Sequence, residues 1–124
     1  MKLLIVDDSK FSQIVASNLF KKIDENVEII FANDGKEGFE KYKDNKPNYS
    51  IIDLLMPKLN GKELIKLIKE YDKDAKLFVV SADVQNSVKE EVLSYGIMGF
   101  INKPLNEEKV KSIYDIIKGD NNEG

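Results

Sequence analysis

Short apolar segments alternate with amphipathic ones along this chain, and this alternation restricts its fold more than any other feature. Residues 3–6 and 77–80 are apolar throughout, which is typical of strands covered on both faces. Parallel strands need long, usually helical connections, so the alternation predicts an α/β domain with a parallel sheet. The strands are expected at residues 3–6, 27–31, 49–52, 77–80 and 99–102.

The expected helices follow these strands and carry start signals. Ser9 is the expected N-cap of the first helix. Asp34 with Glu37, and Asn60 with Glu63, have the spacing of a capping box, in which each side chain bonds the other residue's backbone N–H. The helices are expected at about residues 10–22, 34–45, 60–71, 86–95 and 106–118.

Other patterns place these elements in the domain. Glu28 interrupts the second strand, so that strand is expected at an edge of the sheet. Residues 119–124 are polar and are expected to form a frayed tail after a domain of residues 1–118. Apolar residues at helical spacing are Phe11, Ile14, Val15 and Leu19 in the first helix and, as the inner face of the fifth, Val110, Ile113, Tyr114 and Ile117.

Composition excludes several classes of function. The 124 residues, 42% of them hydrophobic, fit one globular domain, and the interspersed charges, net −3, indicate neither a nucleic-acid partner nor an anionic membrane. The chain has no Cys and no His, which excludes thiolate chemistry and removes the commonest general base. No apolar run is long enough for a signal peptide or a membrane span, so we expect a cytoplasmic protein.

Polar side chains follow four of the five predicted strands. Asp7 and Asp8 come after the first strand, Asp53 after the third, Ser81 after the fourth and Lys103 after the fifth. The carboxyl ends of parallel strands meet at one edge, and ligands bind there, where the strand order reverses. If the first and third strands are neighbours at that reversal, three carboxylates crowd into one pocket.

Three like charges in one pocket need a counter-ion. Carboxylate ligands without His or Cys favour Mg²⁺, which commonly also binds a phosphate oxygen. The predicted site is therefore suited to receive a phosphoryl group. In it Asp53 is the nucleophile, Lys103 a point charge and Ser81 a hydroxyl donor.

Each of these features alone has a simpler interpretation. Asp7 and Asp8 would ordinarily form a solvated turn or a helix cap, and Asp53 would begin a turn. Lys103 and Pro104 would form an ordinary turn. The functional interpretation depends on four separate strand ends that supply compatible groups.

Several short motifs lie at these strand ends. They are Asp7-Asp8, Asp53-Leu54-Leu55-Met56-Pro57 with Gly61, Ser81-Ala82 and Lys103-Pro104. In this combination the chain resembles the response-regulator receiver domains of two-component signalling over essentially its whole length. The resemblance implies a flavodoxin-like fold, a doubly wound five-stranded parallel sheet in the order 2-1-3-4-5 with five helices.

The resemblance also implies a role for each site residue. Asp53 would be the phosphoacceptor, and Mg²⁺ would bind Asp8, Asp53 and the Leu55 backbone carbonyl while Asp7 assists. Lys103 would contact the phosphoryl group through its ammonium, and its peptide bond to Pro104 is expected to be cis.

Ser81 and Phe100 match the switch positions of the family. Ser81 would move toward the phosphoryl group, and the Phe100 ring would follow it. The family more often has Thr and Tyr at these two positions, and Phe100 lacks the phenol hydroxyl, so any switch must work by packing. The alternative is that Phe100 is simply a core residue on an edge strand.

The function that the resemblance implies is a single-domain phosphoacceptor switch without other enzymatic activity. The phosphoryl donor would be a sensor histidine kinase or a phosphotransfer protein. Output would go to a protein target through the fourth helix, fifth strand and fifth helix, either in chemotaxis or in a phosphorelay.

Two further residues could set the lifetime of the phosphorylated form. Leu55 lies two positions after Asp53, and Asp83 lies two positions after Ser81. Because Leu55 is apolar, we expect slow self-hydrolysis of the phosphorylated form.

Rival functions fit the sequence less well. A metal-dependent aspartyl phosphatase of the haloacid-dehalogenase type needs a second acid two residues after the nucleophile, where Leu55 stands. A flavin or nucleotide binder of the same topology, or a non-catalytic module built on it, is a further alternative. Such a binder needs a loop rich in Ser, Thr or Gly after the first strand, and here Asp7 and Asp8 would repel a bare phosphate.

Overall fold

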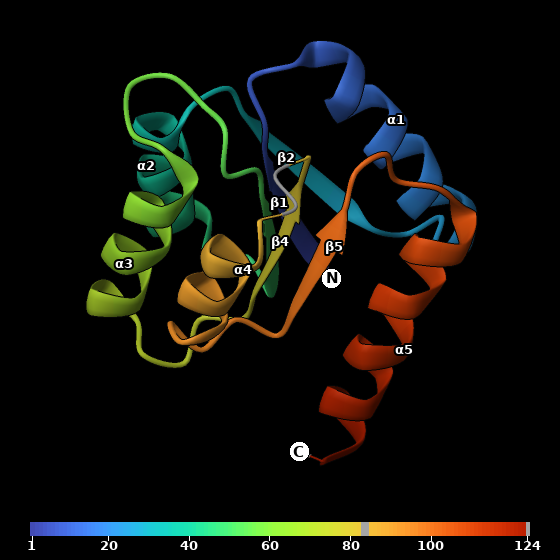
Figure 1. Cartoon of the computed structure of the whole chain (residues 1–124). Helices are drawn as coiled ribbons and strands as arrows, with labels where there is room; N and C mark the ends of the chain where they lie inside the picture. Colours follow the sequence, from blue (N-terminus) through green and yellow to red (C-terminus); the bar gives the residue numbers. More distant parts are fainter. Residues whose placement is uncertain (83–84, 124) are drawn as a thin grey trace.

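One parallel sheet runs through the molecule in the order β2-β1-β3-β4-β5, which confirms the expected α/β class and strand order (Figure 1). The computed structural model describes residues 1–82 and 85–123. Within these ranges the strands are β1 (Lys2–Val6), β2 (Glu28–Ala32), β3 (Tyr49–Ile52), β4 (Leu77–Ser81) and β5 (Gly99–Asn102). β2 lies at an edge of the sheet, as Glu28 predicts.

Helices cover both faces of the sheet. Figure 1 shows α1 and α5 on one side and α2, α3 and α4 on the other. β2 pairs with one edge of β1, whereas β3 pairs with the opposite edge of β1. The strand order therefore reverses between β1 and β3, at whose carboxyl ends ligands commonly bind in such sheets. The helices are α1 (Lys10–Ile23), α2 (Gly35–Asn45), α3 (Gly61–Tyr71), α4 (Asn86–Leu93) and α5 (Glu107–Glu123).

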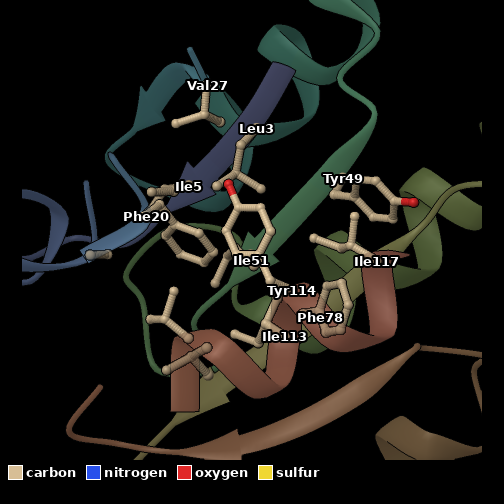
Figure 2. Packing of buried hydrophobic residues seen from close by; sticks show 13 residues of the cluster. Leu3, Ile5, Phe20, Val27, Tyr49, Ile51, Phe78, Ile113, Tyr114 and Ile117 are labelled. Carbon is tan, nitrogen blue, oxygen red and sulfur yellow. The ribbon is translucent and has the colours of Figure 1, made fainter. Parts of the chain in front are cut away.

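The side chains of each strand alternate between two apolar cores. Figure 2 shows the core under α1 and α5, where Phe20 and Tyr114 lie with ring centroids 5.7 Å apart. The inner face predicted for α5 is confirmed. Burial of each such side chain is worth about 1.5–3 kcal/mol. The second core contains Leu4, Val6, Ile52 and Val79 of the sheet and Leu64, Ile65 and Ile68 of α3.

The buried face of α1 differs from the one that its apolar spacing suggests. Phe11 and Ile14 are 77% and 57% exposed. The buried residues of α1 are Gln13, Ala16, Ser17 and Phe20. Phe20 fills the core and the Gln13 amide bonds backbone carbonyls at the ends of the strands, and together these contacts fix the rotation of the helix.

The predicted N-caps are confirmed. Ser9 Oγ accepts from the Ser12 N–H, Asp34 Oδ1 from the Glu37 N–H, and Asn60 Oδ1 from the Glu63 N–H. The return bonds of the capping boxes differ from the expectation. The Glu37 carboxylate accepts from the Asn33 N–H, and the Glu63 carboxylate accepts from the Asn60 side-chain amide.

The last helix extends beyond its expected end. The polar segment from Gly119 is helical through Glu123 in the structure. One physical reason is Asp120, whose carboxylate accepts from the Tyr49 hydroxyl at 2.7 Å and from Lys76 Nζ at 2.5 Å. α4 is shorter than expected and ends at Leu93. In the described part of the chain, no helix has both the length and the apolar character needed to cross a bilayer.

Gly35 permits a close approach of α2 to the loop between β3 and α3. A Cβ atom at Gly35 would lie 2.0 Å from the Leu59 carbonyl oxygen, whereas one at Gly119 would meet nothing within 4 Å.

We expect Gly35→Ala to lower the free energy of unfolding by about 1–3 kcal/mol. The matched variant Gly119→Ala should raise it by about 0.4–1 kcal/mol, because alanine restricts the unfolded chain. Urea unfolding followed by circular dichroism tests both, and equal effects of the two variants would contradict the close contact.

Candidate functional site

The register of the sheet brings Asp7 and Asp53 to the same place. β1 and β3 are paired with Val6 opposite Ile52, so the next residue of each strand emerges at the carboxyl edge. The Asp53 N–H donates to the Val6 carbonyl at 3.0 Å. Asp7 and Asp53 are each only 6% exposed, whereas Asp8 is exposed. One carboxylate oxygen from each of these three residues lies within 4.8 Å of the other two.

Lys103 follows the edge strand β5, and its side chain extends past the end of β4 to this cluster. Its Nζ lies 2.8 Å from Asp7 Oδ2 and 3.1 Å from Asp53 Oδ2, so one ammonium bonds two carboxylates. Its backbone N–H donates to the Ser81 carbonyl at 2.9 Å, which fixes the start of the side chain at the end of β4. The Lys103–Pro104 peptide bond is cis, as expected.

Asp53 and Lys103 each influence the pKa of the other. Burial raises the pKa of Asp53 above its ordinary 3.8, and bonds from the Leu55 N–H and from Lys103 offset this rise in part. For Lys103 burial favours a lower pKa, but the carboxylates of Asp7 and Asp53 outweigh it, so its pKa is raised above 10.5. The lysine is therefore held as a cation, while the ionised form of Asp53 is costly.

The donor set at this edge suits a hard divalent cation. Three carboxylates and one ammonium leave two negative charges uncompensated when all four groups are ionised. Asp8 is the exposed member and faces a groove of about 460 Å³ beside the loop from Leu54 to Pro57. With oxygen donors alone, these residues fit Mg²⁺ and do not suit zinc or copper.

The two predicted switch residues lie on the same face of the sheet. Ser81 ends β4 and is fully buried, and Phe100 on β5 is partly buried. Phe100 pairs with Val79, and since side chains alternate along a strand, Ser81 points to the same side as Val79. Phe100 packs with the core under α3 and α4, and Lys89 Nζ of α4 lies 5.9 Å from the centre of its ring. Ser81 therefore lies at the end of β4 beside Lys103, and Phe100 lies farther from the carboxyl edge on the same face.

The loop that follows Asp53 is held by close backbone contacts. The Gly61 N–H donates to the Leu54 carbonyl, and a Cβ atom at Gly61 would lie 2.4 Å from the Asp53 carbonyl oxygen. Leu55 donates its N–H to Asp53 Oδ1 at 3.2 Å, and 57% of its surface is exposed beside the site. Asp83, the second residue expected to set the lifetime, lies outside the described residues.

One buried residue of the site region was missed in the reading of the sequence. Gln13 is 5% exposed, and its side-chain amide donates to the Asp7 carbonyl at 2.7 Å. A glutamine among helix residues does not register as a core position when apolar spacing is scored. The available signal was its spacing of three, four and seven residues before Ala16, Ser17 and Phe20, which together form the buried face.

A second hollow adjoins the cluster on the α1 side. It has a volume of about 150 Å³, and Asp7, Asp53 and Lys103 contribute its charged wall. The rest of its lining is largely apolar and includes Phe11 and Leu105. The carboxylate cluster is thus reached from two sides.

Comparison with known proteins identifies the family. The family model for the response regulator receiver domain matches residues 3–115 of this chain. The chain belongs to the response regulator receiver domains. Receiver domains are switches of two-component signalling, and the resemblance stated from the motifs is therefore confirmed.

Chemotaxis proteins are among the similar receiver domains. The chemotaxis protein CheY of Thermotoga maritima is 36% identical over 109 residues, which cover 88% of this chain and 90% of that protein. A chain of the CheX–CheY–BeF3–Mg²⁺ complex of Borrelia burgdorferi has a TM-score of 0.85 at 34% identity, with 90% of this chain and 84% of that chain covered. A CheY-like receiver domain of Methanospirillum hungatei shares the fold with a TM-score of 0.89 at 22% identity, over 99% of this chain and 98% of that one.

The raised pKa of Asp53 predicts that Asp53→Asn is more stable than the parent receiver domain in metal-free buffer. A raised folded-state pKa means that the parent loses stability as the pH rises from 3.8, where the unfolded carboxyl ionises, through the folded-state value. The variant avoids this loss. Its advantage should therefore be small below pH 3.8, grow through that window and remain constant above it.

Denaturant unfolding at several pH values measures this difference. Asp44→Asn replaces an exposed carboxylate on α2 and should change stability by less than about 0.5 kcal/mol at every pH. An Asp53→Asn variant that is less stable than the parent at neutral pH would contradict a costly buried charge at this position.

Proposed function

We propose that this receiver domain accepts a phosphoryl group on Asp53 in a reaction that depends on Mg²⁺, and that it signals through protein contacts in a chemotaxis-type pathway. The observation that carries the proposal is the Lys103 ammonium bonded to Asp7 and Asp53 beside the exposed Asp8. A carboxylate nucleophile, a cation-binding pair and a lysine at one sheet edge are the parts that phosphoryl transfer requires.

The proposed step moves the phosphoryl group from a donor nitrogen to a carboxylate oxygen. An oxygen of Asp53 attacks phosphorus, the bond between phosphorus and the donor's histidine nitrogen breaks, and its electron pair remains on that nitrogen. The other ring nitrogen of the donor imidazole carries a proton before the transfer, so the products are an acyl phosphate on Asp53 and a neutral donor imidazole. The Leu55 N–H and Lys103 each bond one oxygen of Asp53, so the carboxylate is oriented before the donor arrives.

The surrounding groups balance the added charge. Asp8, Asp53 and the Leu55 carbonyl would hold Mg²⁺, with Asp7 in support. The ion would supply positive charge at the phosphoryl oxygens. Lys103 would turn from the carboxylates to a phosphoryl oxygen, and Ser81 would donate its hydroxyl to another. The BeF3 and Mg²⁺ in the Borrelia complex support this assignment by similarity.

The proposed partners follow from the chemistry and from the relatives. The donor is a sensor histidine kinase or a phosphotransfer protein, because the chain has no histidine of its own. The output surface is formed by α4, β5 and α5, where Phe100 packs beside α4. A CheX-like protein is one candidate target, because the similar CheY of Borrelia burgdorferi is in a complex with CheX. Neither nucleic acid nor a membrane is a proposed partner.

A small phosphodonor tests the proposal. Incubation with acetyl phosphate and MgCl2 should add the mass of one phosphoryl group to the wild type, and chelation of the metal with EDTA should abolish the adduct. Asp53→Asn should gain no mass, because an amide oxygen is a poor nucleophile. Asp44→Asn is the matched control and should react like the wild type.

The proposal would be overturned by an unmodified wild type under these conditions or by an equal adduct on Asp53→Asn. Rapid multiple turnover of acetyl phosphate would instead favour the aspartyl phosphatase. No second acid stands two residues after Asp53 to support that chemistry, since Leu55 occupies the position.

Leu55 is the proposed control on signal lifetime. Its side chain is 57% exposed at the mouth of the site, where an apolar group disfavours an ordered attacking water. Leu55→Asn should therefore speed the loss of the phosphoryl group several-fold, as measured by the decay of the mass adduct after the donor is removed. Leu55→Met preserves the apolar character and should decay at the wild-type rate. A Leu55→Asn rate equal to or slower than that of the wild type would remove this role.

A further inference from the structure

We infer that Gln13 is a positioning residue that sets the affinity of the carboxylate cluster for Mg²⁺ by fixing the peptide between Asp7 and Asp8. The inference rests on the proposed function, because it assigns a supporting residue to the same cation site. Gln13 carries no charge and does not itself reach the cluster oxygens. Its action would pass through backbone geometry.

The Gln13 amide connects the carboxyl ends of two strands. Its Nε2 donates to the Asp7 carbonyl at 2.7 Å, to Asn33 Oδ1 at 3.0 Å and to the Ala32 carbonyl at 3.3 Å. The Asp7 N–H also donates to the Ala32 carbonyl, at 3.0 Å. The side chain is therefore the donor for three acceptors at the point where β1 and β2 both end.

The orientation of this amide is determined by its neighbours. Asn33 donates its own side-chain N–H to the Glu37 carboxylate, which leaves Asn33 Oδ1 free to accept from Gln13. A reversed Gln13 amide would place its oxygen against three acceptors. Because Gln13 is 5% exposed, water does not readily replace these bonds, and their loss would leave buried carbonyls without this donor.

Fixing the Asp7 carbonyl also fixes the start of Asp8. The carbonyl belongs to the planar peptide unit that joins Asp7 to Asp8, so its direction determines where the Asp8 backbone begins. The Asp7 side chain is held independently, by the Ser9 N–H at 2.9 Å and by Lys103. Asp8 is exposed, so fewer contacts hold its side chain in place. The direction of this peptide therefore determines whether the Asp8 carboxylate faces those of Asp7 and Asp53.

The expected consequence is a specific loss of cation affinity. In metal sites, removal of a group that orients a ligand typically costs about 10–100-fold in affinity. Gln13→Met keeps the length and volume of the side chain but has no N–H donor. It should weaken Mg²⁺ binding about tenfold while the fold is retained.

Two control variants separate positioning from general stability. Ser17→Ala removes another buried polar group one helical turn later on the same face of α1. Phe20→Leu removes volume from the core of α1 and lowers stability without a contact to the cluster. Both should bind Mg²⁺ with the wild-type affinity.

The experiment is a titration of the ¹⁵N-labelled full chain with MgCl2, in which backbone amide shifts report both binding and folding. Saturable shifts near Asp8 and Asp53 in the wild type, with a dissociation constant about tenfold higher in Gln13→Met, are the expected result. Gln13→Asn keeps the amide but shortens its reach, so it should also bind more weakly. It replaces Gln13→Met if that variant does not fold.

The possible failures are distinguishable. A wild type without saturable shifts would overturn the proposed cation site itself. A wild type that binds, together with a Gln13 variant of equal affinity, would overturn only the positioning role. A variant with a lower melting temperature but unchanged affinity would show that the Gln13 amide serves stability alone. Equal weakening in Phe20→Leu would also overturn the inference, since it would attribute the loss to general destabilisation.

Discussion

Lys103 carries one ammonium that two carboxylates share, and the edge of the sheet is arranged around this contact. Lys103 follows β5, while Asp53 follows β3 and Asp7 follows β1, so the side chain must extend across the end of β4. Its backbone N–H is bonded to the Ser81 carbonyl at the tip of β4, which gives the long side chain a fixed origin. Without the ammonium, two nearly buried carboxylates would lie side by side without compensation, at a cost of several kcal/mol.

Close backbone packing supports the loops that carry the carboxylates. The loop after Asp53 lies against Gly61 at its beginning and against Gly35 near Leu59. The turn after β1 is held by the Gln13 amide. Thus α1, α2 and α3 all contribute to the site, although their residues supply no group for the proposed chemistry. A rigid scaffold that presents reactive residues on loops is the usual arrangement in sheets of this class.

Much of the fold and the site could be predicted because strong local signals agreed with one another. The apolar segments at residues 3–6 and 77–80, and the alternation of such segments with amphipathic ones, predicted the parallel sheet. Capping residues located the starts of three helices. The polar residues after four of the five strands then indicated the site. The buried face of α1 could not be predicted, because Phe11 and Ile14 are exposed while polar Gln13 and Ser17 are buried. The extent of α5 depended on Asp120, whose partners Tyr49 and Lys76 are distant in sequence. Contacts of this kind appear only once the fold has formed.

A crystal structure of the chain with Mg²⁺ and beryllofluoride, a phosphoryl mimic, would show whether Asp53 receives the phosphoryl group. We expect beryllium bonded to a carboxylate oxygen of Asp53 and Mg²⁺ bound by Asp8, Asp53 and the Leu55 carbonyl. We also expect Lys103 Nζ to have moved from the carboxylates to a fluorine. An Asp53 carboxylate that remains paired with Lys103, with beryllofluoride absent or bound elsewhere, would contradict the proposed phosphoacceptor site.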